Sequence, residues 1–141
     1  MTKRLRRGLT VPAALATLAA AGAAAAPASA AGYNGACGTG YTVIDSRSLG
    51  DATTVFLTWN RATGKNCVVH QITTDNGGWP WLIGAWVQRT ADDRKSQDHG
   101  EYTRYAGPVY VNGRGTCINW GGRLGSDPSQ HNVAEYASHC G

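Results

Sequence analysis

The sequence lacks the short motifs that identify several classes of enzyme and metal protein. No two cysteines have the C-x-x-C spacing of zinc sites. Neither the G-x-S-x-G turn of serine hydrolases nor the H-E-x-x-H helix of metalloproteases occurs. We therefore predict no catalytic residue, no metal and no cofactor, and expect a protein that is not an enzyme.

An excess of charge is also missing from most of the chain. The whole sequence has 13 basic and 9 acidic residues, but four of the basic ones lie within the first seven residues. Residues 31–141 therefore hold nine basic residues (13 − 4) against nine acidic ones, a net charge of zero. A nucleic-acid binder is expected to carry a positive excess, so we predict no nucleic-acid partner.

The first 30 residues read as a cleavable signal peptide. Four basic residues precede an apolar stretch over residues 9–26, and the small residues Ala28 and Ala30 fit signal peptidase. A membrane anchor is the alternative, because the stretch is nearly long enough to span a bilayer. Its richness in alanine and the absence of a charged cluster after it favour cleavage between Ala30 and Ala31. We expect residues 31–141 to form one secreted domain, with no membrane attachment after cleavage.

All four cysteines lie beyond the expected cleavage site, at Cys37, Cys67, Cys117 and Cys140. An even number of cysteines in a short exported chain predicts disulfides. Three pairings are possible. We favour Cys37 with Cys67 and Cys117 with Cys140, because each pair brackets a coherent stretch of sequence.

The pattern of residues 31–141 is that of an all-β protein. Runs of β-branched and alternating residues are separated by turn residues, with almost no helical periodicity. Six strands are expected, at residues 41–46, 53–60, 66–74, 81–88, 102–111 and 116–120. The last two are expected to form a hairpin around Asn112-Gly113. Residues 91–101 are expected to be a charged loop and residues 126–141 a mostly irregular tail, with room for one helical turn at residues 133–138. The fold class is a small antiparallel β-sandwich or barrel of about six strands, stapled by two disulfides.

Neither the histidines nor the acidic cluster predicts chemistry. If Cys67 and Val69 face the core, His70 faces away from it, and the remaining histidines lie in the charged loop and the tail, at His99, His131 and His139. The acidic residues of the loop resemble neither a calcium loop nor the paired carboxylates of a glycosidase, since basic residues lie between them. They are Asp92, Asp93, Asp98 and Glu101. We interpret them as a solvated surface.

Aromatic residues are the feature most suggestive of a ligand. All five tryptophans lie beyond residue 30, and Trp79, Trp81 and Trp86 gather in one segment. Flat rings on a sheet can stack on sugars, so this segment is a tentative surface for binding a glycan. Core packing and self-association are the alternatives. Strand alternation places Trp81 and Trp86 on opposite faces.

Three segments carry a resemblance to a known family. They are AGYNGACGTGY at residues 31–41, TVFLTWNRATGKNCVV at residues 54–69 and YAGPVYVNGRGTCINWGG at residues 105–122. In order and spacing they resemble the spore-associated protein A family of streptomycetes and related actinomycetes, with the four cysteines at the family's positions. Residues 79–99 are the part that matches least. The resemblance implies a small exported protein found with spores, and it implies no catalytic residues.

Three functions remain open from the sequence. The leading one is a non-enzymatic secreted protein with a structural or interaction role at the spore or cell exterior. Its partners would be spore or cell-wall surface material, or other copies of itself. The second is a secreted module that binds a glycan or a protein, including an inhibitor that presents residues 49–52 or 112–115. The third is a small hydrolase, which would need His70 or His99 to meet a carboxylate.

Overall fold

The computed structural model describes residues 32–127 and 131–141, and these residues form eight β-strands and no helix. The expected signal peptide and its cleavage site lie outside the described residues. No helix in the described part is long and apolar enough to cross a membrane. The strands are β1 (Tyr41–Leu49), β2 (Thr53–Asn60), β3 (Lys65–Ile72), β4 (Trp81–Arg89), β5 (Lys95–Tyr102), β6 (Tyr105–Asn112), β7 (Ile118–Leu124) and β8 (Asn132–Ser138).

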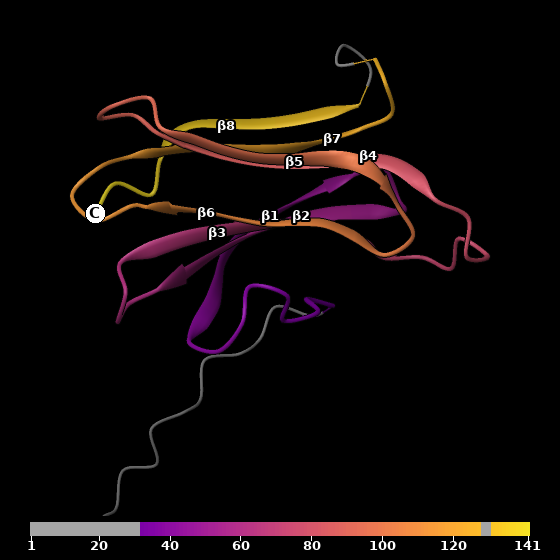
Figure 1. The fold of residues 1–141 in the computed structure, drawn as a ribbon, viewed down its shortest axis with the longest axis horizontal. Helices are drawn as coiled ribbons and strands as arrows, with labels where there is room; N and C mark the ends of the chain where they lie inside the picture. The colour runs from indigo at the N-terminus through magenta and orange to yellow at the C-terminus, as the bar shows by residue number, and fades with distance from the viewer. Residues whose placement is uncertain (1–31, 128–130) are drawn as a thin grey trace, which may run out of the picture.

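The strands form two antiparallel sheets stacked as a sandwich (Figure 1). The first sheet has the order β1-β2-β3-β6 and the second has the order β5-β4-β7-β8. The chain enters the second sheet at β4, returns to the first at β6 and crosses again to β7. The all-β sandwich expected from the sequence is confirmed, with eight strands in place of six.

The main core lies between the sheets and follows from strand alternation. Alternate residues of β2 and β3 point toward the second sheet, and alternate residues of β4 and β7 point toward the first. Trp120 is the largest side chain that is fully buried there, and its indole Nε1 donates to Ser138 Oγ at 3.1 Å. Around it lie Val55, Leu57, Val68, Ile83, Val87 and Ile118, each fully enclosed.

A smaller core lies on the other face of the first sheet and explains one wrong expectation. Residues 32–40 cross this face, where Cys37 bonds to Cys67 and the ring of Tyr33 packs 5.4 Å from that of Phe56. The strand β3 is therefore buried on both faces. The sequence suggested that His70 faces away from the core. Cys67 in fact faces the smaller core, and His70 points between the two sheets.

Two segments expected to be irregular are strands. Most of the charged loop is β5, an edge strand whose alternate residues face solvent, so its charges remain hydrated while its backbone pairs with β4. The expected tail contains β8, which pairs with β7 and displaces the expected helical turn. The expected hairpin around Asn112-Gly113 is also wrong. β6 and β7 belong to different sheets, and residues 113–117 carry the chain from one to the other.

Side-chain bonds close the sandwich along both open sides. On one side, Arg47 of β1 bonds Glu135 of β8 through its Nε at 2.7 Å. On the other, Asp98 of β5 accepts hydrogen bonds from the Tyr102 hydroxyl at 2.6 Å and from the Gly107 amide of β6 at 2.8 Å. The second disulfide joins Cys117 to Cys140 and fastens the chain end beside β7. Both disulfides are the pairs that the sequence favours.

Candidate functional site

A hollow of about 430 Å³ lies on the outer face of the second sheet, and we call it the outer groove. It is built from strand positions whose side chains alternate with those of the core. Its floor and walls come from β4, β5, β7 and β8, so the rigid sheet itself positions the site. Its lining includes Gly84, Trp86, Gln97, His99, Arg123 and Tyr136.

Glycines keep the floor of the outer groove low. A side-chain carbon on Gly84 would lie 2.8 Å from His99 Cδ2 and 3.1 Å from the carbonyl of Asp98. One on Gly121 would lie 3.0 Å from Trp86 Nε1 and only 1.9 Å from the carbonyl of Val133. The lack of side chains therefore lets the ring of Trp86 lie against β7 and lets β8 approach closely.

Two aromatic rings form the apolar part of the outer groove. Trp86 of β4 and Tyr136 of β8 have ring centroids 6.4 Å apart, with planes inclined at 45°. Tyr136 is 70% exposed. The ammonium of Lys95 lies 5.1 Å from the centroid of Trp86, in cation–π contact.

Polar groups surround the rings. Arg123 Nη2 donates to His99 Nδ1 at 2.8 Å, because a guanidinium can only donate. Burial, and secondarily the charge of Arg123, lower the pKa of His99, so the imidazole is neutral at physiological pH. The amide side chains of Gln88, Gln97 and Asn132 add donors and acceptors along the walls. Flat rings beside amides and a guanidinium suit a ligand with apolar faces and hydroxyl edges.

The three tryptophans of the tentative glycan surface do not form one surface. Trp79 is 74% exposed in the connection between β3 and β4 and does not line the outer groove. Trp81 packs against the main core, and only Trp86 lines the groove. Their alternation on β4 is as expected. Tyr136 was not expected in a site, because the segment that holds it reads as an irregular tail.

The histidines are held by structural contacts. His70 Nδ1 lies 3.0 Å from the carbonyl of Gly84, and its Nε2 lies 2.9 Å from the hydroxyl of Thr53. Burial lowers the pKa of His70 to about 4. His139 Nε2 lies 3.1 Å from Asp45. His131 is exposed before β8.

The acidic residues expected in a loop are divided between two places. Asp98 ties β5 to β6, as described above, and Glu101 is exposed on β5. Asp92 contacts two arginines, and Asp93 accepts a hydrogen bond from Gln88. In the described part of the chain no three histidine, cysteine, aspartate or glutamate residues lie where they could hold a metal ion together.

Comparison with known proteins finds a relative of this chain. Over 127 residues it is 46% identical to spore-associated protein A of Streptomyces coelicolor, covering 90% of this chain and 78% of the relative. The chain belongs to the spore-associated protein A family. No protein-family model and no solved structure matches it. The family resemblance of the three sequence segments is therefore confirmed. The name of the relative associates that protein with spores and states no activity or ligand.

Proposed function

We propose that this member of the spore-associated protein A family is an exported, non-enzymatic protein that acts at the spore or cell exterior by binding surface material. The observation that carries the proposal is the 46% identity to a relative named for its association with spores. The signal-like residues 1–30 and the two disulfides support export, since disulfides persist in oxidising surroundings. The contacts of His70, His99 and His139 support structural roles for these residues.

Retention on spores tests this role. The secreted protein is mixed with washed spores, purified spore walls, peptidoglycan and chitin, and the pellets are washed in high salt. We expect the spores and their walls to retain it. A protein that stays wholly in the supernatant of every sample would contradict the proposal. The remaining candidates would then be a soluble inhibitor, tested against proteases, and a hydrolase, tested by product release from the same polymers.

A second function, glycan binding, is favoured by one specific observation. Trp86 and Tyr136 share a hollow with amide side chains and Arg123. A sugar ring has an apolar face that can stack on such rings, while its hydroxyls reach the amides. In this function the outer groove is the part of the protein that holds the spore or wall polymer.

Tryptophan fluorescence with soluble peptidoglycan fragments and chitin oligosaccharides measures this binding. We expect these ligands to quench the tryptophan fluorescence. Tyr136→Ala should raise the dissociation constant about tenfold, on the scale of one buried aromatic contact of ~1–2 kcal/mol. Trp79→Ala is the matched control, because Trp79 is equally exposed but lies away from the outer groove. An equal loss in both variants, or no quenching with any glycan, would remove the groove as a glycan site.

A further inference from the structure

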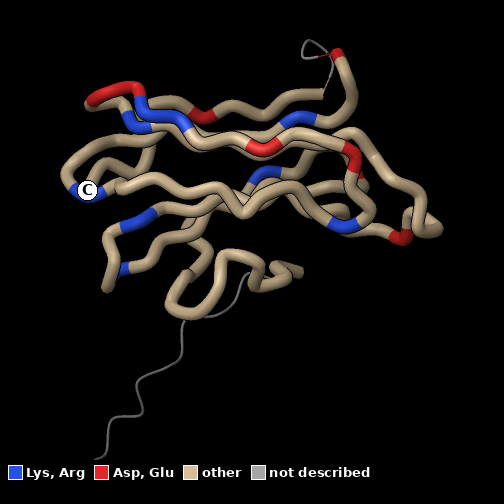
Figure 2. Tube along the Cα trace, viewed as in Figure 1, with Lys and Arg blue, Asp and Glu red and all other residues tan. Residues whose placement is uncertain are grey.

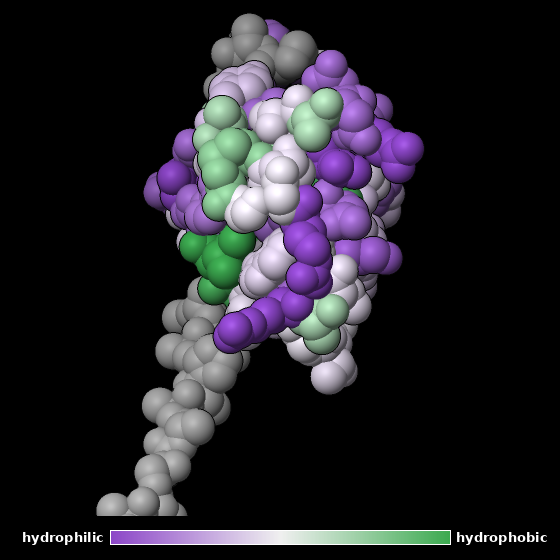
Figure 3. Space-filling view, turned by 90° about the vertical axis from the view of Figure 1, so that its left-hand side faces the viewer, coloured by the Kyte–Doolittle hydropathy of each residue, from purple (hydrophilic) through white to green (hydrophobic). Residues whose placement is uncertain are grey.

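The basic residues of this chain are gathered at one end of the sandwich, although residues 31–141 have no net charge. Six of the nine lie in the β2–β3 turn, at the adjoining ends of β3, β4 and β5, in the β4–β5 loop and in the β6–β7 connection. They are Arg61, Lys65, Arg89, Arg94, Lys95 and Arg114, and we call this the basic end. Only Asp92 and Asp93, of nine acidic residues, accompany them. Figure 2 shows the blue segments on the left, and Figure 3 shows strongly hydrophilic side chains crossing this end.

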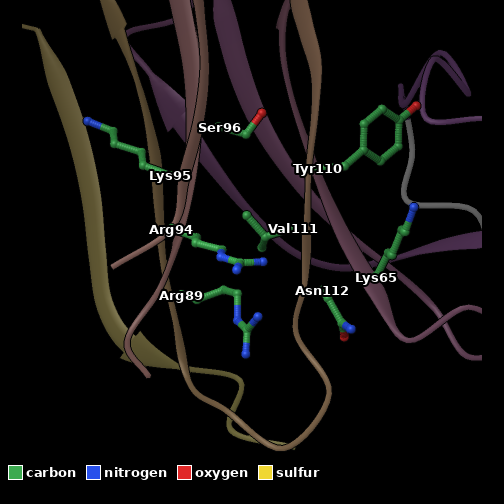
Figure 4. Close-up of a pocket in the computed structure, with 8 residues that line it drawn as sticks. All are labelled: Lys65, Arg89, Arg94, Lys95, Ser96, Tyr110, Val111 and Asn112. Carbon is green, nitrogen blue, oxygen red and sulfur yellow. The ribbon is translucent and has the colours of Figure 1, made fainter. Parts of the chain in front are cut away.

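A hollow of about 520 Å³ opens within the basic end, and we call it the basic pocket. Lys65 of β3 lies on one side of it, and Arg89 and Arg94 reach toward β6 from the other (Figure 4). Asn112 and Val111 of β6 lie between them. Three cations from three parts of the chain therefore line one hollow, with the Lys65 ammonium on the Tyr110 side of β6 and the two guanidiniums on the other side. Lys95 points away, toward Trp86 on the outer groove.

The positive charge of the basic pocket is only partly neutralised. Asp92 lies 3.4 Å from Arg89 Nη1 and 3.2 Å from Arg94 Nε, so a single carboxylate serves two guanidiniums. Arg89 Nε is buried and has no hydrogen-bond partner among the described residues. The ammonium of Lys65 has no acidic partner in the described part of the chain either. Cations held close together without matching acids repel one another, and a bound anion relieves that repulsion.

We propose that the basic pocket binds a phosphate group carried by a polymer other than a nucleic acid. A phosphate presents oxygens in several directions, which suits cations that approach from opposite walls of the pocket. A planar carboxylate is satisfied by the fork of one arginine and leaves the other cations unmatched. The backbone amide of Arg114 donates to Asn112 Oδ1 at 3.1 Å. This bond holds the Asn112 side chain at the rim of the pocket and leaves the Asn112 Nδ2 to donate to the same anion.

The proposal is tested with the exported protein, expressed from the full chain, and long-chain inorganic polyphosphate as the ligand. Fluorescence polarisation of labelled polyphosphate is measured at low ionic strength, where screening is weakest. Arg94→Gln should raise the dissociation constant about threefold to fivefold, and Lys65→Gln with Arg94→Gln about tenfold. Both side chains are exposed, Arg94 by 78%, so the variants should fold. Arg89 is left intact because its guanidinium is mostly buried.

The matched control is Arg104→Gln. Arg104 is exposed just after β5, at the opposite end of the sandwich, and its substitution removes the same charge. We expect its dissociation constant to stay within about 1.5-fold of that of the unsubstituted protein. An equal loss in Arg104→Gln would show that overall charge, and not the pocket, holds the polymer.

Three other ligands define the chemistry. Polyglutamate of similar charge should bind several-fold more weakly, and equal binding would refute the preference for phosphate. Dextran sulfate also carries tetrahedral oxyanions. If it binds as tightly as polyphosphate, the pocket recognises the shape of the oxyanion, and the assignment to phosphate alone is refuted. Tighter binding of a short DNA duplex would overturn the assignment to a simple phosphate polymer. No binding of polyphosphate at low salt would refute the proposal outright.

Discussion

Acidification should destabilise this fold through His70. The imidazole is enclosed between the two sheets, and burial lowers its pKa from 6.5 to about 4. The Nδ1 facing the Gly84 carbonyl must carry the proton of the neutral ring, because a carbonyl only accepts. The Nε2 of the neutral ring is then an acceptor, and the single hydroxyl proton of Thr53 is donated either to it or to the Leu49 carbonyl, each at 2.9 Å.

The sign of the pH effect follows from the two pKa values. Above pH 6.5 the ring is neutral in the folded and the unfolded chain, and the stabilisation by a neutral His70 is complete. Below pH 6.5 the unfolded chain binds a proton that the folded chain excludes. The free energy of unfolding then falls by about 1.4 kcal/mol per pH unit down to pH about 4, or about 3 kcal/mol in all.

Urea denaturation from pH 7.5 to pH 4, on the unsubstituted protein and on His70→Gln, measures this loss. The variant retains an amide that can donate to Gly84 but cannot titrate, so all other ionisable groups cancel in the difference. We expect the variant to be less stable at pH 7 by about 1–3 kcal/mol. The difference should fall by about 3 kcal/mol toward pH 4, so that the variant becomes as stable as the unsubstituted protein or more stable. A difference that stays constant over this range would refute the assignment of a buried neutral His70.

Three further perturbations test the fold that carries the two sites. Changing Cys37 and Cys67 to serine together should lower the free energy of unfolding by about 3–4 kcal/mol, the chain entropy of a loop of 30 residues, whereas an unchanged urea midpoint would refute this. Gly121→Ala should push β8 away from β7, because the new carbon would lie 1.9 Å from a backbone carbonyl, and amide hydrogen exchange in β8 should rise. Asp98→Ala should cost about 1–3 kcal/mol by leaving the Tyr102 hydroxyl of β5 and the Gly107 amide of β6 without their acceptor, and unchanged exchange protection of the Gly107 amide would contradict that role.

Most of the fold could be predicted from local pattern. The strand at residues 53–60 has the predicted bounds. The two disulfides are the favoured pairs, each of which brackets a coherent stretch of sequence. The connection of β6 to β7 could not be predicted, since Asn-Gly suits a hairpin locally and only the packing of the two sheets makes it a crossover.

The missed strands and the outer groove share one cause. β5 is composed of charged and polar residues because it is an edge strand with one face in water, so it carries no apolar signal. β8 has positive φ at Ala137 and a register shift opposite β7, which breaks its alternation. Tyr136 lies within this strand, and its partner Trp86 lies 50 residues earlier in the chain. Only the pairing of β7 with both β4 and β8 brings the two rings together.

The net charge of the sequence is a poor guide to the partners of the folded protein. Equal numbers of acids and bases exclude strong attraction between the whole molecule and a distant polyanion, but they do not fix where the charges lie. Antiparallel strands return to the same end of the sandwich, so cations from Arg61 to Arg114 meet there. The opposite end carries Asp51, Asp75 and Glu101 against Arg104. Within a Debye length of ~8–10 Å at physiological salt, an anionic surface therefore attracts the strongly positive end of the molecule and repels the negative end. The molecule turns its basic pocket toward that surface.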